Sequence, residues 1–205
     1  MTLRNITCAV TLCLLTLSGQ AVGKTEVPPY KNKSLSIEKR VDDLMGRMTL
    51  REKVLQLQNR GAGRLDEIDR IFNGESYGCT HEMGTTAAEC AAMYKELQQY
   101  MLTKTRLGIP IITSAEGIQG ILQNNCTLFP HALAQGSTFN PALIQRMTEA
   151  AGEEAKVIGI HQILSPVLDI ARELRWGRVE ETFGEDPYLI SEMGIAFING
   201  YQKNR

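Results

Sequence analysis

Apolar residues recur at helical spacing in several stretches of the chain, and polar capping residues stand at the start of most of them. Thr49 and Thr86 are each followed three positions later by a glutamate, which is the spacing of a capping box. Asn140-Pro141 and Asp186-Pro187 each combine an N-cap residue with a proline suited to the first helical turn. The pattern predicts helices after these starts and after Ser36, each with one apolar face. The residues on those faces are Val41, Leu44, Met45 and Met48; then Leu50, Val54 and Leu57; then Cys90, Tyr94, Leu97 and Met101; then Ile144, Met147, Ala151, Ala155 and Ile158; and last Ile190, Met193 and Phe197.

Two short apolar runs are predicted to be strands. Residues 109–113 (IPIIT) are too few for a helix and are continuously apolar, as in a strand covered on both faces. A second buried strand is predicted at about residues 163–170, and residues 61–84 are turn-rich and read as one long loop. The order strand, helix, strand, helix behind an N-terminal helical segment indicates an α/β fold with a parallel sheet and crossover helices.

Two architectures fit that order, a doubly wound sheet and a (β/α)₈ barrel. No glycine-rich phosphate turn follows either strand, and residues 117–120 (GIQG) match the dinucleotide fingerprint poorly. Both strands instead run into loops that carry acids and arginines. This placement favours the barrel, where chemistry gathers at the carboxyl ends of the strands.

The densest polar segment is residues 165–187, SPVLDIARELRWGRVEETFGEDP. It leaves the second predicted strand and holds Arg172, Arg175, Arg178, Trp176 and a series of carboxylates before the next helix begins. Such a density of paired charge at the end of a strand indicates a polar binding site.

Composition excludes several classes of partner. The 205 residues include 22 Lys and Arg against 23 Asp and Glu, so the balance gives no reason to expect nucleic acid or an anionic membrane surface. Cys79, Cys90 and Cys126 lack the close spacing of metal ligands, and the histidines are scattered. Neither a metal site nor another cofactor is therefore expected, and the pairing of the three thiols stays open between one disulfide and none.

The first residues are predicted to be a signal peptide. Residues 1–23 carry an apolar run at 9–17 and end in Ala21-Val22-Gly23, small residues of the kind a signal peptidase reads. The run is shorter than the roughly 20 apolar residues of a membrane span. We expect export to the periplasm or the extracellular space, with no membrane attachment after cleavage, and a tether over residues 24–35.

Three segments carry a resemblance to a known family. They are LGIPIITSAEGIQG, TLFPHALAQGSTFNPALIQRM and GIHQILSPVLDIARELRWGRVEETFGEDPYLISEMGIAFINGYQ. In order and spacing they resemble the N-terminal barrel of glycoside hydrolase family 3, the β-glucosidase and β-xylosidase family. The resemblance covers about residues 36–205, and RWGRVEETFGEDP is its most specific element.

The resemblance implies roles for two residues. Glu116, just past the first strand, would accept hydrogen bonds from hydroxyls of the sugar nearest the scissile bond, and Arg178 would reach the same sugar. A carboxylate and a planar guanidinium suit vicinal hydroxyls, because charge-assisted hydrogen bonds are stronger than neutral ones. The alternatives are a solvated Glu116 and an Arg178 that only neutralises nearby acids. Glu181 and Arg175 are expected in a supporting ion-pair network, with the alternative that Glu181 orients Arg178. Trp176 is expected to pack rather than to stack on sugar.

Length limits what the chain is expected to do. A complete barrel takes about 250 residues, and the resemblance implies an aspartate nucleophile on a later strand and an acid/base carboxylate beyond the barrel. No catalytic residue is therefore assigned here, since both are expected beyond Arg205, in the rest of the barrel and a second domain. Residues 36–205 are predicted to be the N-terminal part of a (β/α)₈ barrel from a retaining, exo-acting β-glycosidase acting on terminal β-linked glucose in a β-glucoside or oligosaccharide. Alone it is expected to be inactive and to aggregate. The alternatives are a secreted, non-catalytic sugar-binding module and a β-xylosidase parent.

Overall fold

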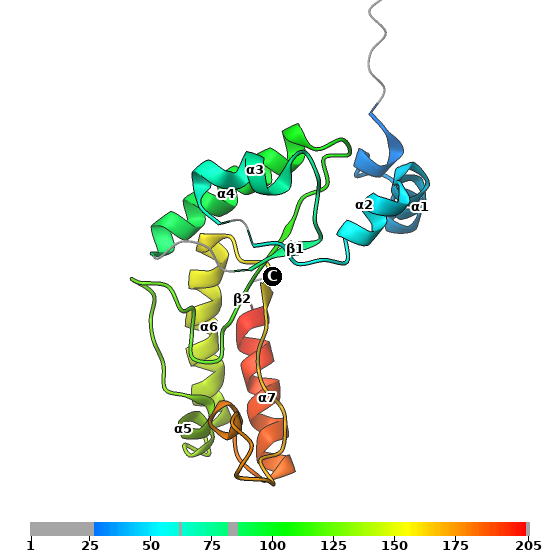
Figure 1. Ribbon diagram of the computed structural model, residues 1–205. Helices are drawn as coiled ribbons and strands as arrows, with labels where there is room; N and C mark the ends of the chain where they lie inside the picture. The colour runs from blue at the N-terminus through cyan, green and yellow to red at the C-terminus, as the bar shows by residue number, and fades with distance from the viewer. Residues whose placement is uncertain (1–26, 62, 82–85, 204–205) are drawn as a thin grey trace, which may run out of the picture. The chain divides into compact units, whose positions relative to one another are not determined.

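The computed structural model describes residues 27–61, 63–81 and 86–203 (Figure 1). The predicted signal peptide and residues 24–26 of the predicted tether lie outside the described residues. The chain divides into two compact units, Met1–Arg47 and Met48–Arg205. In the described ranges no helix is both long and apolar enough to cross a membrane.

The first unit holds the short helix η1 (Pro29–Lys31) against the predicted helix α1 (Ile37–Arg47). The Tyr30 N–H donates to the Asp43 carboxylate at 3.1 Å, and Arg40 Nε donates to the Tyr30 carbonyl at 3.1 Å. Arg47 Nε completes the cluster at 2.9 Å from Asp43. Polar contacts therefore hold η1 to α1.

The second unit is built on a three-stranded parallel sheet in the order β1 (Cys79–Thr80), β2 (Ile112–Ala115), β3 (Gln162–Ile163). Cys79 pairs with Ile112, and Ser114 pairs with Gln162. Helix α4 (Ala87–Lys104) connects β1 to β2, and α5 (Ala132–Gly136) and α6 (Pro141–Ile158) connect β2 to β3. Helix α7 (Pro187–Gln202) follows β3 and runs beside α6 (Figure 1). The predicted parallel sheet with crossover helices is confirmed.

The predicted helix boundaries are confirmed by their caps. Thr49 and Thr86 form capping boxes with Glu52 and Glu89 at the starts of α2 (Leu50–Leu55) and α4. Asn140 and Asp186 each accept a hydrogen bond from the backbone three residues on, at 3.1 and 2.8 Å. Gly159 ends α6 with φ of 93°, a left-handed conformation in which glycine lacks the usual penalty.

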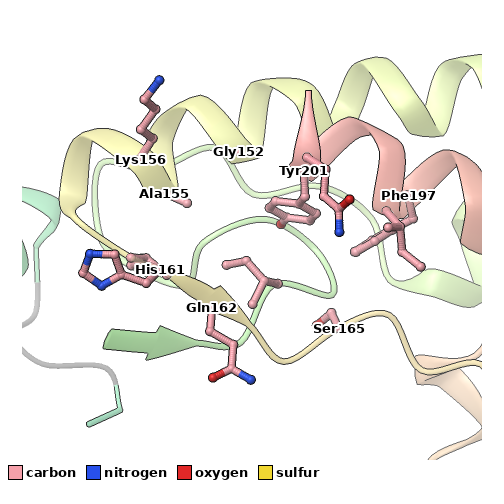
Figure 2. A pocket seen from close by; sticks show the side chains of 12 residues that line it. Gly152, Ala155, Lys156, His161, Gln162, Ser165, Phe197 and Tyr201 are labelled. Carbon is pink, nitrogen blue, oxygen red and sulfur yellow. The ribbon is translucent and has the colours of Figure 1, made fainter. Parts of the chain in front are cut away.

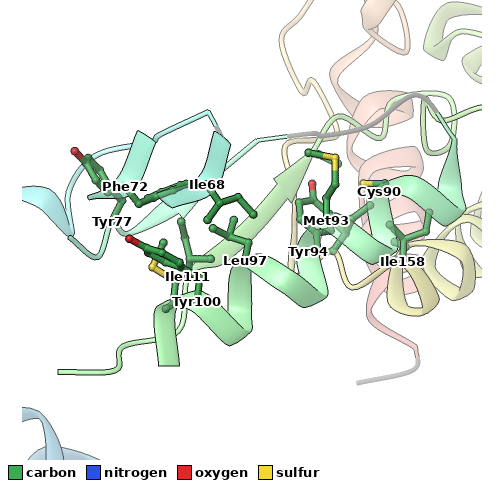
Figure 3. Packing of buried hydrophobic residues seen from close by; sticks show 14 of the residues in the cluster. Ile68, Phe72, Tyr77, Cys90, Met93, Tyr94, Leu97, Tyr100, Ile111 and Ile158 are labelled. Atoms are coloured by element: carbon green, nitrogen blue, oxygen red, sulfur yellow. The ribbon is translucent and has the colours of Figure 1, made fainter. Parts of the chain in front are cut away.

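Two hydrophobic clusters stabilise the second unit. In the first, the predicted apolar face of α4 packs with Phe72 and Tyr77, whose rings meet edge to face at 5.6 Å between centroids (Figure 3). The second lies between α6 and α7 and includes Phe183 and Phe197. Every residue predicted for the faces of α4, α6 and α7 is buried.

The predicted face of α2 is wrong. Leu50, Val54 and Leu57 are 78, 45 and 88% exposed, whereas Leu55 is 6% exposed. Helix α2 has only six residues, so apolar spacing does not decide which side faces inward. The deciding contact is tertiary: the Gly78 N–H donates to the Leu55 carbonyl at 3.2 Å, which sets the end of α2 against the start of β1.

The predicted second strand is too long and not buried. Only residues 162–163 pair, and Leu164, Leu168 and Ile170 are exposed. In the part of the chain that the structure describes, β3 is an edge strand, and the last bond from it to β2 is donated by the Leu164 N–H to the Ala115 carbonyl at 3.0 Å. The predicted loop at 61–84 is also corrected, because it contains η2 (Leu65–Glu67), α3 (Ile68–Phe72) and β1.

Glu52 ties α2 to the chain after α4, and its contribution should depend on pH. Its carboxylate accepts from the Thr49 N–H at 2.8 Å and from Arg106 at 2.8 and 2.5 Å. The Arg106 hydrogen bonds, with those of Thr49, lower the Glu52 pKa to about 2. A carboxyl group whose pKa is lowered by folding stabilises the fold fully when the pH is above its unfolded pKa, near 4.5. This stabilisation is lost as the pH falls towards the folded pKa of about 2.

Glu52→Gln should therefore lower the free energy of unfolding by about 1 kcal/mol at pH 7, a value kept small because Arg106 is largely solvated. The difference from the unsubstituted chain should shrink between pH 4.5 and 2. Urea unfolding across this range measures it. Glu173→Gln is the comparison: Glu173 also has a lowered pKa of about 2, but its partner Arg175 is only two residues away, so the pair persists in part in the unfolded chain and the substitution should change stability less. A pH-independent effect of Glu52→Gln would contradict the assignment.

Candidate functional site

Glu116 follows β2 directly and is half-buried at the carboxyl end of the sheet. The next residue is fixed on two sides: the Gly117 N–H donates to Ser165 Oγ at 3.2 Å, and the Gly117 carbonyl accepts from the Tyr201 hydroxyl at 2.8 Å. A Cβ on Gly117 would lie 2.5 Å from Ile163 Cγ2, so no larger residue fits without movement. The backbone that carries Glu116 is thus held against both β3 and α7.

Arg178 stands at the same end of the sheet, in the long segment after β3, as the N-cap of η3 (Val179–Glu181). Its Nε and Nη2 both donate to Glu181 Oε2, at 2.9 and 2.5 Å. The Glu181 bond raises the pKa of Arg178, and the charges of Asp169 and Glu116 add to that effect. The charge of Glu116 thus acts on Arg178, although the two residues follow different strands.

Glu181 is the more buried member of the ion pair with Arg178. Its side chain is mostly buried, whereas that of Arg178 is mostly exposed. The hydrogen bond from Arg178 lowers the Glu181 pKa, and the charge of His131 acts in the same direction. Glu181 thus anchors one edge of the Arg178 guanidinium.

Arg175 lies outside this cluster. It donates to Glu173 at 2.7 and 2.8 Å in an exposed turn, and these bonds lower the Glu173 pKa to about 2. Asp186 caps α7, as expected from its sequence position. Trp176 is only half-buried, which is less than a packing role predicts.

Asp169 is a site residue that the sequence interpretation did not single out. It lies six residues beyond β3, is exposed, and is close enough for its charge to raise the Arg178 pKa. Its sequence signal was weak, because one carboxylate among several in residues 165–187 carries no distinguishing spacing. The candidate site thus contains three carboxylates and one guanidinium: Glu116, Asp169, Glu181 and Arg178.

The histidine and cysteine side chains serve other contacts. His161 Nδ1 lies 2.6 Å from Thr113 Oγ1, so this histidine links β2 to the start of β3. In the part of the chain that the structure describes, no disulfide joins Cys79, Cys90 or Cys126, and burial raises the pKa of Cys126. Within the described ranges, no three His, Cys, Asp or Glu side chains converge as metal ligands.

A cavity of about 330 Å³ lies between α6, β3 and α7 (Figure 2). Its lining includes Lys156, His161, Gln162, Phe197 and Tyr201, and the Tyr201 ring points into it. Neither Glu116 nor Arg178 lines this cavity. The candidate site is therefore the charged rim at the strand ends rather than this space under α7.

Comparison with known proteins defines the class of this fold and site. The β-glucosidase from Listeria innocua, solved in complex with glucose, superposes with a TM-score of 0.66 at 31% identity over 80% of this chain and 24% of its own. A β-glucosidase of intestinal bacteria involved in saponin metabolism gives 0.67 at 37% identity over 81% and 21%. The fold is accordingly the first part of the (β/α)₈ barrel of such glycosidases, as predicted.

The family follows from the sequence. Residues 49–205 match the model of the glycosyl hydrolase family 3 N-terminal domain, and the chain belongs to that family. A putative β-xylosidase of Formosa agariphila is 35% identical over 88% of this chain and 26% of its own length. β-Glucosidase C of Emericella nidulans is 34% identical over 86% and 31%. The chain thus spans between a quarter and a third of these relatives.

Proposed function

We propose that this chain supplies the sugar-binding part of a β-glycosidase active site, with Glu116 and Arg178 holding one terminal sugar. The observation that carries the proposal is that Glu116 directly follows β2 while Arg178 lies in the segment after β3, near enough for the charge of Glu116 to act on Arg178. Family membership supports a β-glycoside as the ligand class. Glucose is the preferred sugar, because the Listeria innocua relative was solved with it.

The two groups have complementary capacity for a sugar. An ionised carboxylate accepts hydrogen bonds from two neighbouring hydroxyls, and a guanidinium donates in a planar fork. Glu181 occupies the Nε and Nη2 atoms of Arg178, so Nη1 is the part of the fork that we assign to a sugar oxygen. Glu181 then acts as a positioning residue, and Arg175 is left out of the site because its bonds go to Glu173.

We further propose that the 205 residues bind a sugar without hydrolysing it. Retaining hydrolysis needs two carboxyl groups about 5 Å apart, one of which has a raised pKa and acts as the acid. Among the described residues, every Asp or Glu whose pKa is resolved as shifted is shifted down. A nucleophile and an acid would come from a longer protein of the relatives' size, completing the barrel and adding a second domain.

Glucose titration of the ¹⁵N-labelled chain tests the binding site. Glu116→Ala and Arg178→Ala should each weaken glucose binding by about 10- to 100-fold, because hydrogen bonds to charged groups contribute about 1.5–3 kcal/mol. Glu173→Ala, in the exposed turn outside the site, is the control and should bind like the unsubstituted chain. Xylose is titrated in parallel, since the Formosa relative is a putative β-xylosidase.

An assay of nitrophenol release from an aryl β-glucoside tests the proposal that the chain does not hydrolyse a sugar. The chain should give no release above background. Turnover that Glu116→Ala abolishes would overturn the proposal of binding without hydrolysis. A chain that binds neither sugar would overturn the assignment of Glu116 and Arg178.

We also propose that the protein is exported. Two relatives are named periplasmic β-glucosidases, from Salmonella typhimurium and Dickeya chrysanthemi, the latter also as a β-xylosidase. The apolar run and small residues before residue 24 suit cleavage there. N-terminal sequencing of the protein from a periplasmic extract should find Lys24 first, and an uncleaved cytoplasmic product would contradict export.

A further inference from the structure

Gln135 is a buried amide that joins two loops of the candidate site. It lies on α5 with 2% of its surface exposed. Its Nε2 donates to the Ile118 carbonyl at 2.9 Å and to the Pro130 carbonyl at 2.7 Å. Ile118 is two residues after Glu116, so one side chain ties the Glu116 loop to the start of α5.

Helix α5 also contacts the segment that carries Arg178. A Cβ on Gly136 would lie 2.2 Å from the Phe183 carbonyl oxygen, which shows how closely the two backbones approach. Phe183 comes two residues after Glu181 and is itself buried in the second hydrophobic cluster. Helix α5 is thus fixed to the backbone next to the anchor of Arg178, while Gln135 reaches from α5 to the loop of Glu116.

The chemistry of Gln135 is not that of a simple packing residue. Both of its neighbours are carbonyl oxygens, so only the NH₂ end of the amide can face them. Its Oε1 is buried and has no hydrogen-bond partner in the described part of the chain. An unpaired buried acceptor costs about 1–3 kcal/mol, and an apolar side chain of the same length would avoid that cost. The two donated bonds are therefore the feature that sets this residue apart.

We propose that Gln135 is a positioning residue that sets the separation of Glu116 and Arg178. The inference rests on the proposed function of these two residues. The Gln135 amide holds the loop after β2 to α5, and the close backbone approach of Gly136 to Phe183 holds the segment after η3 to the same helix. The loop of Glu116 and the segment of Arg178 therefore move together. Loss of the amide lets the Glu116 loop drift from Arg178 while the hydrophobic clusters stay packed.

The chain contains a matched control for this clamp. Gln98 on α4 makes a similar two-bond contact at the amino end of β2: its Nε2 donates to the Ile111 carbonyl at 2.6 Å, and its Oε1 accepts from the Ile111 N–H at 3.2 Å. Gln98→Met and Gln135→Met each replace a hydrogen-bonded amide, half-buried at position 98 and buried at position 135, by an apolar side chain of similar length. Both should reduce stability, but only Gln135→Met should disturb the site.

The first experiment needs no sugar. In the ¹⁵N-labelled full chain, Glu116→Gln removes a charge that acts on Arg178 and should shift the Arg178 Nε–Hε resonance. In the Gln135→Met background that shift should be smaller, because Coulomb interactions fall with distance. In the Gln98→Met background it should keep its size. Equal shifts in all three backgrounds would overturn the role of Gln135, whether or not the chain binds sugar.

Glucose affinity provides the second readout. Gln135→Met should weaken glucose binding by about tenfold or more, since a displacement of about 1 Å has such effects on a site, and Gln98→Met should not. If the unsubstituted chain does not bind glucose, that result contradicts the proposed function only. The resonance measurement still decides the role of Gln135.

A measurement on the unsubstituted chain covers the case in which Gln135→Met does not fold. Gly117 and Glu181 each donate a backbone hydrogen bond, at 3.2 and 3.1 Å, so their amides are protected from exchange until the loops open. If one clamp holds both loops, hydrogen exchange at the two amides should report the same opening free energy. Different opening energies for the two loops would overturn the proposal.

Discussion

Ile195→Lys is expected to turn a self-associating chain into a largely monomeric one. Ile195 lies on α7 beside a groove formed with residues 168–170. Leu168, Ile170, Ile195 and Ile198 around this groove are 47, 37, 57 and 36% exposed. Contiguous apolar surface of this kind promotes association, and a buried lysine charge without a partner opposes it. The substitution should raise the protein concentration at half-association by about tenfold or more, which corresponds to about 1.4 kcal/mol.

Sedimentation velocity over a range of concentrations measures this effect. Val157→Lys is the matched control, because Val157 is also an exposed apolar residue on a helix, but it does not line the groove. It should leave association unchanged. An unsubstituted chain that stays monomeric and melts cooperatively would instead favour the sugar-binding module over the incomplete glycosidase.

Gly200→Ala is expected to give a large loss of stability from a single added methyl group. Gly200 lies where α7 crosses α6, and a Cβ there would be 1.8 Å from Thr148 Oγ1 and 2.5 Å from the Gln145 carbonyl oxygen. The helices would have to separate, and overpacking of this kind costs about 1–3 kcal/mol or more. That cost exceeds the gain of about 0.5–1 kcal/mol that alanine gives inside a helix.

Gly194→Ala provides the comparison within the same helix. Its Cβ would meet the end of the Leu168 side chain at 2.6 Å, and Leu168 is exposed and free to move aside. Gly194→Ala should therefore be nearly neutral, while Gly200→Ala lowers the melting temperature of the second unit. Thermal unfolding followed by circular dichroism measures both, and equal effects would rule out close helix packing as the cause.

Local chemistry explains which parts of the fold were predictable. The starts of α2, α4, α6 and α7 followed from Thr49, Thr86, Asn140 and Asp186, because each cap involves residues only three positions apart. The buried faces of the three long helices followed from their spacing. Strand β1 was missed because it has two residues, and strand pairing is decided by partners distant in sequence.

The same distinction holds for the candidate site. Glu116 and Arg178 were named from the family resemblance and from their positions after strands. The contact of Arg178 with Glu181 spans three residues and was foreseen as one of two interpretations. Gln135 acts on a carbonyl 17 residues away, and nothing in its local sequence indicates that contact. Sequence reasoning thus found the proposed sugar-binding residues, Glu116 and Arg178, more readily than Gln135, which we propose positions them.

The buried hydroxyls of β2 explain how such short strands fix their alignment. Thr113 Oγ1 donates to the Gly159 carbonyl at 2.5 Å, and Ser114 Oγ donates to the Thr80 carbonyl at 2.9 Å, one bond towards each neighbouring strand. Two-residue ladders alone would tolerate slippage. A slip by one residue would bury both hydroxyls away from their acceptors and turn each side chain to the opposite face. Two side-chain oxygens therefore specify a single alignment of the sheet, and with it the place at which Glu116 leaves β2.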